Sequence, residues 1–355
     1  MLLAPGPSPD PGKPEAGGVP AGLFYSIDTE PGITRVRRGK SFAYRDAKGR
    51  WIRDEVHLTR IRKLAIPPAY ESVWICASSN GHLQATGRDA RGRKQYRYHE
   101  VWRRERDTGK FDRLLHFAKA LPGLRRKVTH QLKQKEHSRE LVLATLVRLL
   151  DTTLIRVGND QYARDNGSFG LTTLRNRHVR IEGDLLTLSF KGKSGVRHEV
   201  EVKDPRVLRV VTRCLHLPGQ ELFQYRGADG QPHAIGSGDV NDYLDTLCGE
   251  RFTAKDFRTW HGTVLALETL RKFCGAGGEA FTVKQLLAEV SQALGNTPAV
   301  CRKAYIHPGV LELGLKLAAL KGEGLFDDHV PAPKATGAGL NGAERRLVGY
   351  LTALR

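Results

Sequence analysis

The chain has no long apolar run and no sign of a secretory leader. A helix that spans a bilayer needs about 20 consecutive apolar residues, and none of the apolar runs approaches that length. The first residues, Met1-Leu2-Leu3-Ala4, are followed at once by proline and glycine, without a basic start. We therefore expect neither a signal peptide nor any membrane association.

The cysteines show no metal-binding pattern. They stand at positions 76, 214, 248, 274 and 301, with no CxxC spacing. Structural zinc sites use closely spaced pairs, so this spacing argues against one, and scattered, odd-numbered thiols are typical of reduced cysteines in a cytoplasm. The sequence also has no P-loop in a strand-to-helix setting and no compact acidic cluster of the kind that Mg²⁺ needs. We therefore expect no cofactor and no metal.

What the chain has in excess is positive charge. Its 57 lysines and arginines outnumber 38 aspartates and glutamates, and the formal net charge is +19. Such an excess favours a polyanionic partner, and nucleic acid is the commonest one. A basic protein whose charge serves only solubility is the alternative. With 355 residues, the chain is long enough to bury two separate hydrophobic cores.

Turn signals and apolar periodicity divide the chain into three parts and predict the α+β fold class. Residues 1–22 are rich in proline and glycine and are predicted to be a disordered tail. Residues 23–108 show short apolar runs broken by turns, with hairpins at 42–52 and 73–86, and should form a small β-rich domain. Residues 109–355 follow a helical period and should form a mainly α-helical domain. We find no internal repeat.

Within the helical part, residues 178–202 read as a three-stranded β insert. An apolar stripe from Leu143 to Leu154 predicts the helix before the insert. Asp204 as N-cap and Pro205 in the first turn predict the helix after it. Further helices are expected at 255–273, 283–294 and 297–306, followed by a linker at 330–339 and a short terminal helix.

Tyr305 lies shortly after a predicted helix start and close to Arg302 and Lys303. A phenol in a cationic field can attack a phosphodiester and hold the broken end covalently. Because its solution pKa is about 10, the phenol must lose its proton during the attack. The transition state also needs cationic forks around its oxygens and a proton donor for the leaving 5′ oxygen. A core tyrosine near a helix end is the alternative interpretation.

Three cations are candidates for that support. Arg156 directly follows the apolar helix, and Lys193 is at a predicted hairpin tip. Arg258 lies near a helix start, where its charge opposes the helix dipole unless an anion binds nearby. Each has an ordinary alternative: a surface arginine at a helix end, a lysine that keeps a hairpin soluble, and an ion pair of Arg258 with Asp256.

Taken together, these residues resemble the type IB DNA topoisomerases in their small poxvirus-like and bacterial form. Arg156 and the K-x-x-R-T setting of Arg258 match the family's two catalytic arginines. Lys193 falls at the hairpin-tip lysine that is the family's general acid, and Tyr305 matches the nucleophile. The resemblance covers the chain from about residue 22 to residue 315, by the positions of its motifs.

The resemblance implies a fold and an activity. The fold would be a C-shaped clamp around double-stranded DNA, formed by a small β-rich N-terminal domain and a mainly helical catalytic domain. The activity would be relaxation of supercoiled DNA through transient single-strand cleavage, a 3′-phosphotyrosyl intermediate and religation, without ATP or metal. The enzyme would be a monomer in a bacterial cytoplasm, associated with the nucleoid.

Asn296 departs from the family's pattern, because the family usually has histidine at that position. Asparagine can donate an N–H to a non-bridging oxygen but carries no charge, so some transition-state stabilisation should be lost. We expect Asn296 to take the histidine's role, since it keeps the spacing to Tyr305. His261 and His307 are the alternatives for that role, and a helix cap is the alternative for Asn296 itself.

Residues 87–99 of the N-terminal domain interleave cations with aromatic residues. Cations suit phosphates, glutamine reads the major groove, and tyrosine can contact bases or sugars. The string Arg-Lys-Gln-Tyr-x-Tyr also resembles the family's DNA-contact segment, whereas a solvated basic run is the alternative. The candidates for DNA contact are first Gln95 and Tyr96, and then Arg93, Lys94 and Tyr98.

Two other functions stay open at this point. A site-specific tyrosine recombinase shares the chemistry and a related catalytic fold. However, its second arginine typically sits in H-x-x-R, where this chain has Lys255, and its N-terminal domain is helical rather than β-rich. A non-catalytic DNA-binding protein with a decayed site is the other alternative, which Asn296 keeps open.

Overall fold

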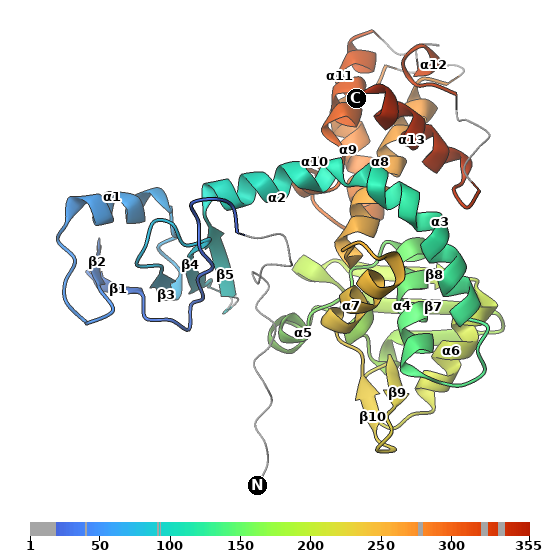
Figure 1. The fold of residues 1–355 in the computed structure, drawn as a ribbon, viewed down its shortest axis with the longest axis horizontal. Helices are drawn as coiled ribbons and strands as arrows, with labels where there is room; N and C mark the ends of the chain where they lie inside the picture. Colours follow the sequence, from blue (N-terminus) through green and yellow to red (C-terminus); the bar gives the residue numbers. More distant parts are fainter. Residues whose placement is uncertain are drawn as a thin grey trace. The chain divides into compact units, whose positions relative to one another are not determined.

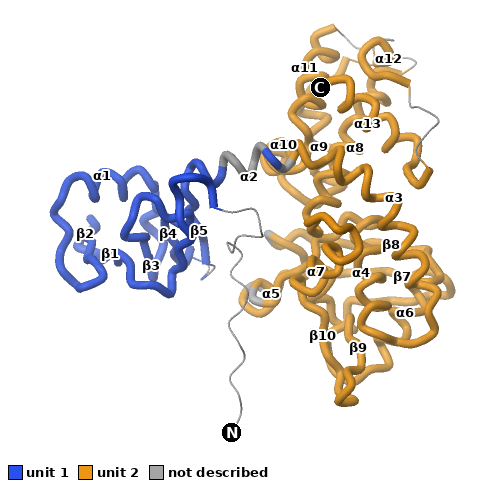
Figure 2. The backbone as a smooth tube through the Cα atoms, in the orientation of Figure 1, with its two compact units in different colours: residues 1–110 blue, residues 111–355 orange. Residues whose placement is uncertain are grey.

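The computed structural model describes residues 19–39, 41–90, 92, 94–275, 280–320, 326–332 and 338–355. Most of the predicted tail, half of the predicted linker and the candidate Arg93 therefore lie outside the described residues. The chain divides into two compact units, Met1–Lys110 and Phe111–Arg355 (Figure 2).

The first unit is built on an antiparallel five-stranded sheet with the strand order β2-β1-β3-β4-β5 (Figure 1). Its strands are β1 (Ile33–Arg38), β2 (Ser41–Arg45), β3 (Glu71–Ile75), β4 (Leu83–Arg88) and β5 (Lys94–Tyr98), and helix α1 spans Glu55–Lys63. The Asp54 carboxylate caps α1 by accepting from the backbone N–H of His57 at 3.2 Å. A small core unites Ile61 of α1 with Ile33, Val73 and Ile75 of the sheet. The β-rich character predicted for the N-terminal part is confirmed.

The two hairpins predicted in this unit fare differently. β3 and β4 pair as predicted, with Trp74 opposite Thr86. The hairpin predicted at 42–52 is present but short: Arg45 forms an antiparallel bridge to Trp51, and the Ile52 backbone N–H donates to the Tyr44 carbonyl at 2.9 Å, whereas the main partner of β2 is β1. The arginines of β1 hid its strand character in the sequence. Gly39, with φ +57, provides the left-handed backbone at the β1–β2 turn.

The second unit is mainly helical, as predicted. Helix α2 (Glu100–Asp112) leads into it. Helices α4 (Arg139–Thr153) and α8 (Ala254–Phe273) lie at its centre with side chains buried on nearly every face, as expected for core helices. None of the described helices is long and apolar enough to cross a membrane. The other helices are α3 (Leu114–Gln131), α5 (Asp160–Asn166), α6 (Pro205–Leu215), α7 (Ser237–Cys248), α9 (Val283–Leu294), α10 (Pro298–Ala304), α11 (Pro308–Ala319), α12 (Phe326–His329) and α13 (Gly342–Ala353).

The predicted β insert is a three-stranded antiparallel meander of β6 (Val179–Glu182), β7 (Leu185–Lys191) and β8 (Arg197–Val202). The predicted cap of the next helix is also confirmed, since Asp204 Oδ1 accepts from the backbone N–H of Arg206 at 3.1 Å. A second small hairpin, β9 (Gln224–Arg226) with β10 (Pro232–Ala234), had not been predicted.

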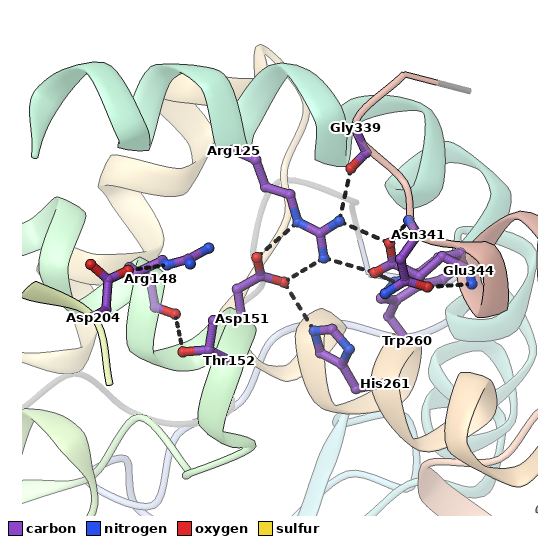
Figure 3. A network of polar contacts seen from close by, with 10 residues as sticks. All are labelled: Arg125, Arg148, Asp151, Thr152, Asp204, Trp260, His261, Gly339, Asn341 and Glu344. Atoms are coloured by element: carbon purple, nitrogen blue, oxygen red, sulfur yellow. Dashed lines mark hydrogen bonds and ion pairs between the residues drawn. The ribbon is translucent and has the colours of Figure 1, made fainter. Parts of the chain in front are cut away.

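A buried polar network joins α13 to α3, α4 and α8 (Figure 3). Arg125 of α3 pairs with Asp151 of α4 at 2.8 Å and with Glu344 of α13 at 2.7 Å. Trp260 Nε1 donates to Glu344 at 3.2 Å, and His261 Nε2 lies 3.0 Å from Asp151 Oδ1. Since Glu344 is only 1 % exposed, this pairing is needed to offset the cost of burying its charge. The network therefore fixes the two central helices to each other.

Candidate active site

Arg156 lies just beyond the C-terminal end of α4. Leu154 ends that helix in a left-handed backbone conformation (φ 59), which is costly for a leucine and turns the chain away from the helix axis. The half-buried Arg156 guanidinium then donates to the Gly295 carbonyl at 3.3 Å and to Asn296 Oδ1. This arginine therefore ties the end of α4 to the turn between α9 and α10, rather than lying on the surface.

Arg258 is buried within α8 and is 3 % exposed. Its Nη2 donates to the Leu294 carbonyl at 2.7 Å and its Nη1 to the Leu154 carbonyl, whereas its Nε is buried without a partner among the described residues. The predicted alternative, a surface ion pair with Asp256, was wrong, because Asp256 accepts from the backbone N–H of Thr253 and caps α8. Its acceptors are carbonyl oxygens, and no carboxylate of the described residues pairs with it, so the positive charge of the guanidinium is available to an anion.

Tyr305 is the residue that ends α10, and its main chain is fixed to α8. Its backbone N–H donates to the Cys301 carbonyl at 3.0 Å, and its own carbonyl accepts from Thr263 Oγ1 at 3.1 Å. Gly262 allows this close approach, because a Cβ at that position would lie 2.8 Å from the Tyr305 carbonyl oxygen. The helix predicted at residues 297–306 thus ends slightly early, with the phenol at its C-terminal end.

Nearby cationic side chains change the pKa of the Tyr305 phenol. The Cζ atom of Arg258 is 5.0 Å from the centroid of its ring. Burial raises the pKa of Tyr305, but the positive charges of Arg258, Arg156 and Lys255, with a hydrogen bond from Arg258, more than compensate, and the pKa is lowered below its ordinary value. The site therefore makes the phenolate that an attack on phosphorus requires easier to form than it is in a free tyrosine.

Asn296 occupies the turn between α9 and α10. Gly295 ends α9 with φ +56, and the Asn296 backbone N–H donates to the Ser291 carbonyl at 2.9 Å. The helix-cap alternative was wrong, because Thr297 is the N-cap of α10. Asn296 Oδ1 accepts from Arg156, while Nδ2 is buried and has no hydrogen-bond partner among the described residues. Such a donor is unusual in a folded protein and can serve a bound oxygen atom.

The two alternative histidines are engaged elsewhere. His261 Nε2 lies 3.0 Å from Asp151 Oδ1 in the buried network. His307 caps α11, where its Nδ1 accepts from the Gly309 backbone N–H at 3.0 Å, and its ring packs edge-on against Phe111. Neither contact directs an imidazole to the space beside Arg156 and Tyr305.

Lys193 is exposed at the tip of the β7–β8 hairpin, as predicted. Its Nζ lies 5.9 Å from the ring centroid of Tyr162 on α5. Direct contacts thus link Arg156, Arg258, Tyr305 and Asn296 in the structure. The position of Lys193 depends instead on the β7–β8 hairpin that carries it. Among the described residues, no group of His, Cys, Asp or Glu side chains is arranged to hold a metal ion.

Sequence reasoning missed His198 of β8. Its ring is stacked on Phe190 at 5.1 Å and reaches both Gly192 at the hairpin tip and Gly295 in the α9–α10 turn. Burial, and then the charges of Arg156 and Arg258, lower the pKa of His198. The available signal was strand alternation, which puts this polar residue on the inner face of β8 with Val200 and Val202.

The described candidates for DNA contact, Lys94, Gln95, Tyr96 and Tyr98, lie on β5, at one edge of its sheet. Side chains alternate along a strand, so Lys94, Tyr96 and Tyr98 share one face and Gln95 lies on the other. Gln95 and Tyr96 therefore do not act side by side.

The contacts of these side chains hold them in place. Lys94 pairs with Asp28 at 2.7 Å, and the rings of Tyr96 and Tyr98 are stacked at 6.1 Å. Gln95 Nε2 donates to Asp89 Oδ2 at 3.0 Å. A nucleic-acid partner would therefore meet an ordered edge strand.

Comparison with known proteins gives two matching family models. The model described as "Eukaryotic DNA topoisomerase I, catalytic core" matches residues 99–309. The model described as "Bacterial DNA topoisomerase IB, N-terminal domain" matches residues 41–89. The first match spans more than half of the chain and includes every residue predicted for the catalytic chemistry.

Individual relatives agree with these matches. DNA topoisomerase 1B of Acanthamoeba polyphaga mimivirus is 32% identical over 294 residues, which cover 79% of this chain and 87% of the relative. DNA topoisomerase 1B of Vaccinia virus (strain Copenhagen) is 25% identical over 253 residues, with coverages of 69% and 76%. A solved structure of the XerH site-specific recombinase bound to palindromic difH substrate is 16% identical, with a TM-score of 0.35 over 54% of this chain and 50% of that chain. That likeness is too low to argue from.

Proposed function

The chain belongs to the type IB DNA topoisomerase family, and from this premise we propose that Tyr305 is the nucleophile of its reaction. The protein is a DNA topoisomerase by its family and its relatives. The observation that carries the assignment of Tyr305 is the Arg258 guanidinium, 5.0 Å from the ring of Tyr305, with its charge unpaired by any described carboxylate. This is the environment in which a phenol becomes a nucleophile.

In the cleavage step, Tyr305 Oη forms a bond to phosphorus and the bond from phosphorus to the 5′ oxygen breaks. The phenolic proton passes to solvent, and Lys193 Nζ donates a proton to the leaving 5′ oxygen. The products are a 3′-phosphotyrosyl link and a free 5′-hydroxyl. Religation reverses the same steps after the nicked duplex has rotated, and it needs no ATP because the covalent link conserves the energy of the broken bond.

The non-bridging oxygens of the transition state are stabilised by three donors. Arg156 and Arg258 provide charged guanidinium groups, and Arg258 Nε has no other partner among the described residues. Asn296 provides Nδ2, whose orientation is fixed because Arg156 donates to Oδ1 of the same amide. In this role Asn296 replaces the family's usual histidine with a neutral donor.

We also propose a monomer on double-stranded DNA, because the proposed residues Arg156, Lys193, Arg258, Asn296 and Tyr305 all come from one chain. The first unit would contact DNA through the β5 edge, with Gln95, Tyr96, Lys94 and Tyr98 as its candidates. The match to a bacterial N-terminal domain supports a bacterial cytoplasm, with the enzyme associated with the nucleoid.

The nucleophile is tested with Tyr305→Phe. Wild-type protein should relax a supercoiled plasmid in EDTA without ATP, whereas Tyr305→Phe should bind the same DNA, form no covalent adduct and leave the plasmid supercoiled. Tyr225→Phe is the matched control, since it removes another half-buried phenolic hydroxyl of the same unit. It should relax DNA like wild type. Relaxation by Tyr305→Phe would show that another residue is the nucleophile.

A further inference from the structure

We propose that His198 is a positioning residue for strand cleavage, its ring holding the hairpin tip that carries Lys193 against the turn that carries Asn296. The inference rests on the proposed function, since it concerns how two of the proposed residues reach the same phosphate. It adds a residue to the site, and it assigns that residue an action through Lys193 rather than on the DNA itself.

The contacts of the ring with two glycines carry the proposal. A Cβ at Gly192 would lie 2.6 Å from His198 Cδ2, and a Cβ at Gly295 would lie 2.3 Å from His198 Cε1. Real Cβ atoms do not approach other atoms so closely, so the ring fits only because both neighbours are glycine. Gly192 directly precedes Lys193, and Gly295 directly precedes Asn296. The ring thus lies between the backbones of two segments that each carry a proposed site residue.

The ring is fixed from its own sheet as well. Phe190 lies directly opposite His198 in the β7–β8 pairing, and the two rings are stacked with an interplanar angle of 13°. Phe190 is itself part of the core of the unit. A shift of the His198 ring would therefore require movement of the core beneath it. Because the ring also contacts the hairpin tip, it fixes the tip relative to the sheet.

The charge of the ring agrees with a positioning role. The pKa of His198 is lowered by burial and by the nearby charges of Arg156 and Arg258, so the imidazole is neutral at neutral pH. A neutral ring can pack between these segments without repelling the two guanidinium groups. The position of Lys193 then follows from packing, and a misplacement of about 1 Å in such a donor can slow a reaction by about 100-fold.

The decisive experiment compares two DNA substrates in single-turnover cleavage. One has the normal 5′ oxygen, and the other has sulfur at the same bridging position, so that the leaving thiolate needs no proton donor. His198→Ala should cleave the oxygen substrate at least about tenfold more slowly than wild type, because Lys193 is displaced. On the sulfur substrate, its rate should return to within about threefold of wild type, because protonation is no longer required.

A double-mutant cycle tests the contact itself. Gly192 has an extended backbone (φ −89, ψ −166) that alanine can adopt, so the added Cβ of Gly192→Ala meets chiefly the His198 ring. This variant should be slow on oxygen and rescued on sulfur. Combining it with His198→Ala removes the clash, and the double variant should be no slower than His198→Ala alone. Additive defects would mean that the two residues act separately.

His233→Ala is the matched control. His233 is also stacked on an aromatic residue of a hairpin, Tyr225, and also packs against a glycine, Gly227, but no proposed site residue lies in its hairpin. It should cleave both substrates like wild type. The melting temperature of each variant shows whether it is folded. If His198→Ala is unfolded, the cleavage rates of Gly192→Ala on the two substrates provide the test instead.

Three outcomes distinguish a failure of the positioning role of His198 from a failure of the proposed function. A rate for His198→Ala within twofold of wild type on the oxygen substrate overturns the inference. An equal slowing on both substrates also overturns it, because the ring would then act on the phosphate or on Tyr305 and not through Lys193. If wild-type protein forms no covalent adduct with either substrate, the proposed function has failed, and that failure is seen before any variant is compared.

Discussion

At the scale of single residues, Asn296 is a neutral side chain among cations. Arg156 donates to its Oδ1, which leaves Nδ2 as a donor with a fixed direction and no described partner. In a histidine at this position, a ring N–H would take over the donation and could add a charge. The difference between the two residues is therefore one of donor strength rather than of geometry.

Single-turnover cleavage by Asn296→Ala and Asn296→His tests this interpretation. The alanine variant loses both the donor and the acceptor of Arg156, and we expect cleavage about 100- to 1,000-fold slower, as for the loss of one transition-state donor. The histidine variant should cleave at least as fast as wild type, because a charge-assisted donor is stronger than a neutral one. Equal rates for all three proteins would show that this position does not touch the phosphate.

The residues that could be predicted from sequence are those with a fixed local setting. Arg258 and Tyr305 stand in short motifs, and Arg156 follows a recognisable apolar helix. The burial of Arg258 could not be predicted, because its acceptors, the Leu154 and Leu294 carbonyls, come from distant helix ends. His198 was missed for the same reason, since its proposed role depends on Gly192 and Gly295, which both come close to its ring only in the folded chain.

At the scale of helices and strands, the sequence predicted best those elements whose ends are marked by nearby residues. The β6–β7–β8 meander and the bounds of α9 were predicted closely, because turn residues and caps mark their ends. Strand β1 was missed because its arginines resemble a solvated run, although pairing with β2 and β3 places it inside the sheet. Helix α11 also went unpredicted. Its start depends on the His307 cap, and histidine is not a common capping residue.

The network around Arg125 makes the packing of α4 against α3 and α8 sensitive to acid. Burial would raise the pKa of Asp151, but its bonds to His261 and Arg125 lower it to about 2, from an ordinary 3.8. The unfolded chain takes up the proton first as pH falls, so the stabilisation is present in full above about pH 4 and is lost toward pH 2. The difference corresponds to about 2 kcal/mol of unfolding free energy.

Asp151→Asn should therefore be less stable than wild type at pH 7, and the difference in unfolding free energy should shrink as pH falls from about 4 toward 2. Urea unfolding followed by circular dichroism over that range measures it. Asp242→Asn, which changes an exposed carboxylate on α7, is the control and should show no such trend. A stability gap for Asp151→Asn that is the same at every pH would contradict the pairing.

At the scale of the whole molecule, the net charge of +19 governs how the protein meets DNA. Each phosphate that a cation neutralises releases a condensed counterion, and the slope of log affinity against log salt is about −0.9 for each phosphate contacted. An enzyme that contacts several phosphates should therefore lose affinity steeply as salt rises.

This is measured with Tyr305→Phe, which should bind duplex DNA without cutting it, between about 50 and 200 mM salt. We expect a slope of several units. Lys94→Gln on the same background should reduce the slope by about 1 if Lys94 leaves Asp28 for a phosphate. A flat dependence on salt would contradict electrostatic binding, and an unchanged slope for Lys94→Gln would remove that residue from the interface.

The attachment of Tyr305 to α8 has a mechanical consequence. With Tyr305 as the proposed nucleophile, the rotating duplex would pull on a single side chain while the cut strand is held. The load would pass from the phosphotyrosyl link into the main chain of Tyr305, whose carbonyl accepts from Thr263, and then into one of the most deeply buried helices of the unit. Torque released from supercoiled DNA would thus be borne by a helix anchored in the core, and the broken end would stay where it can be rejoined.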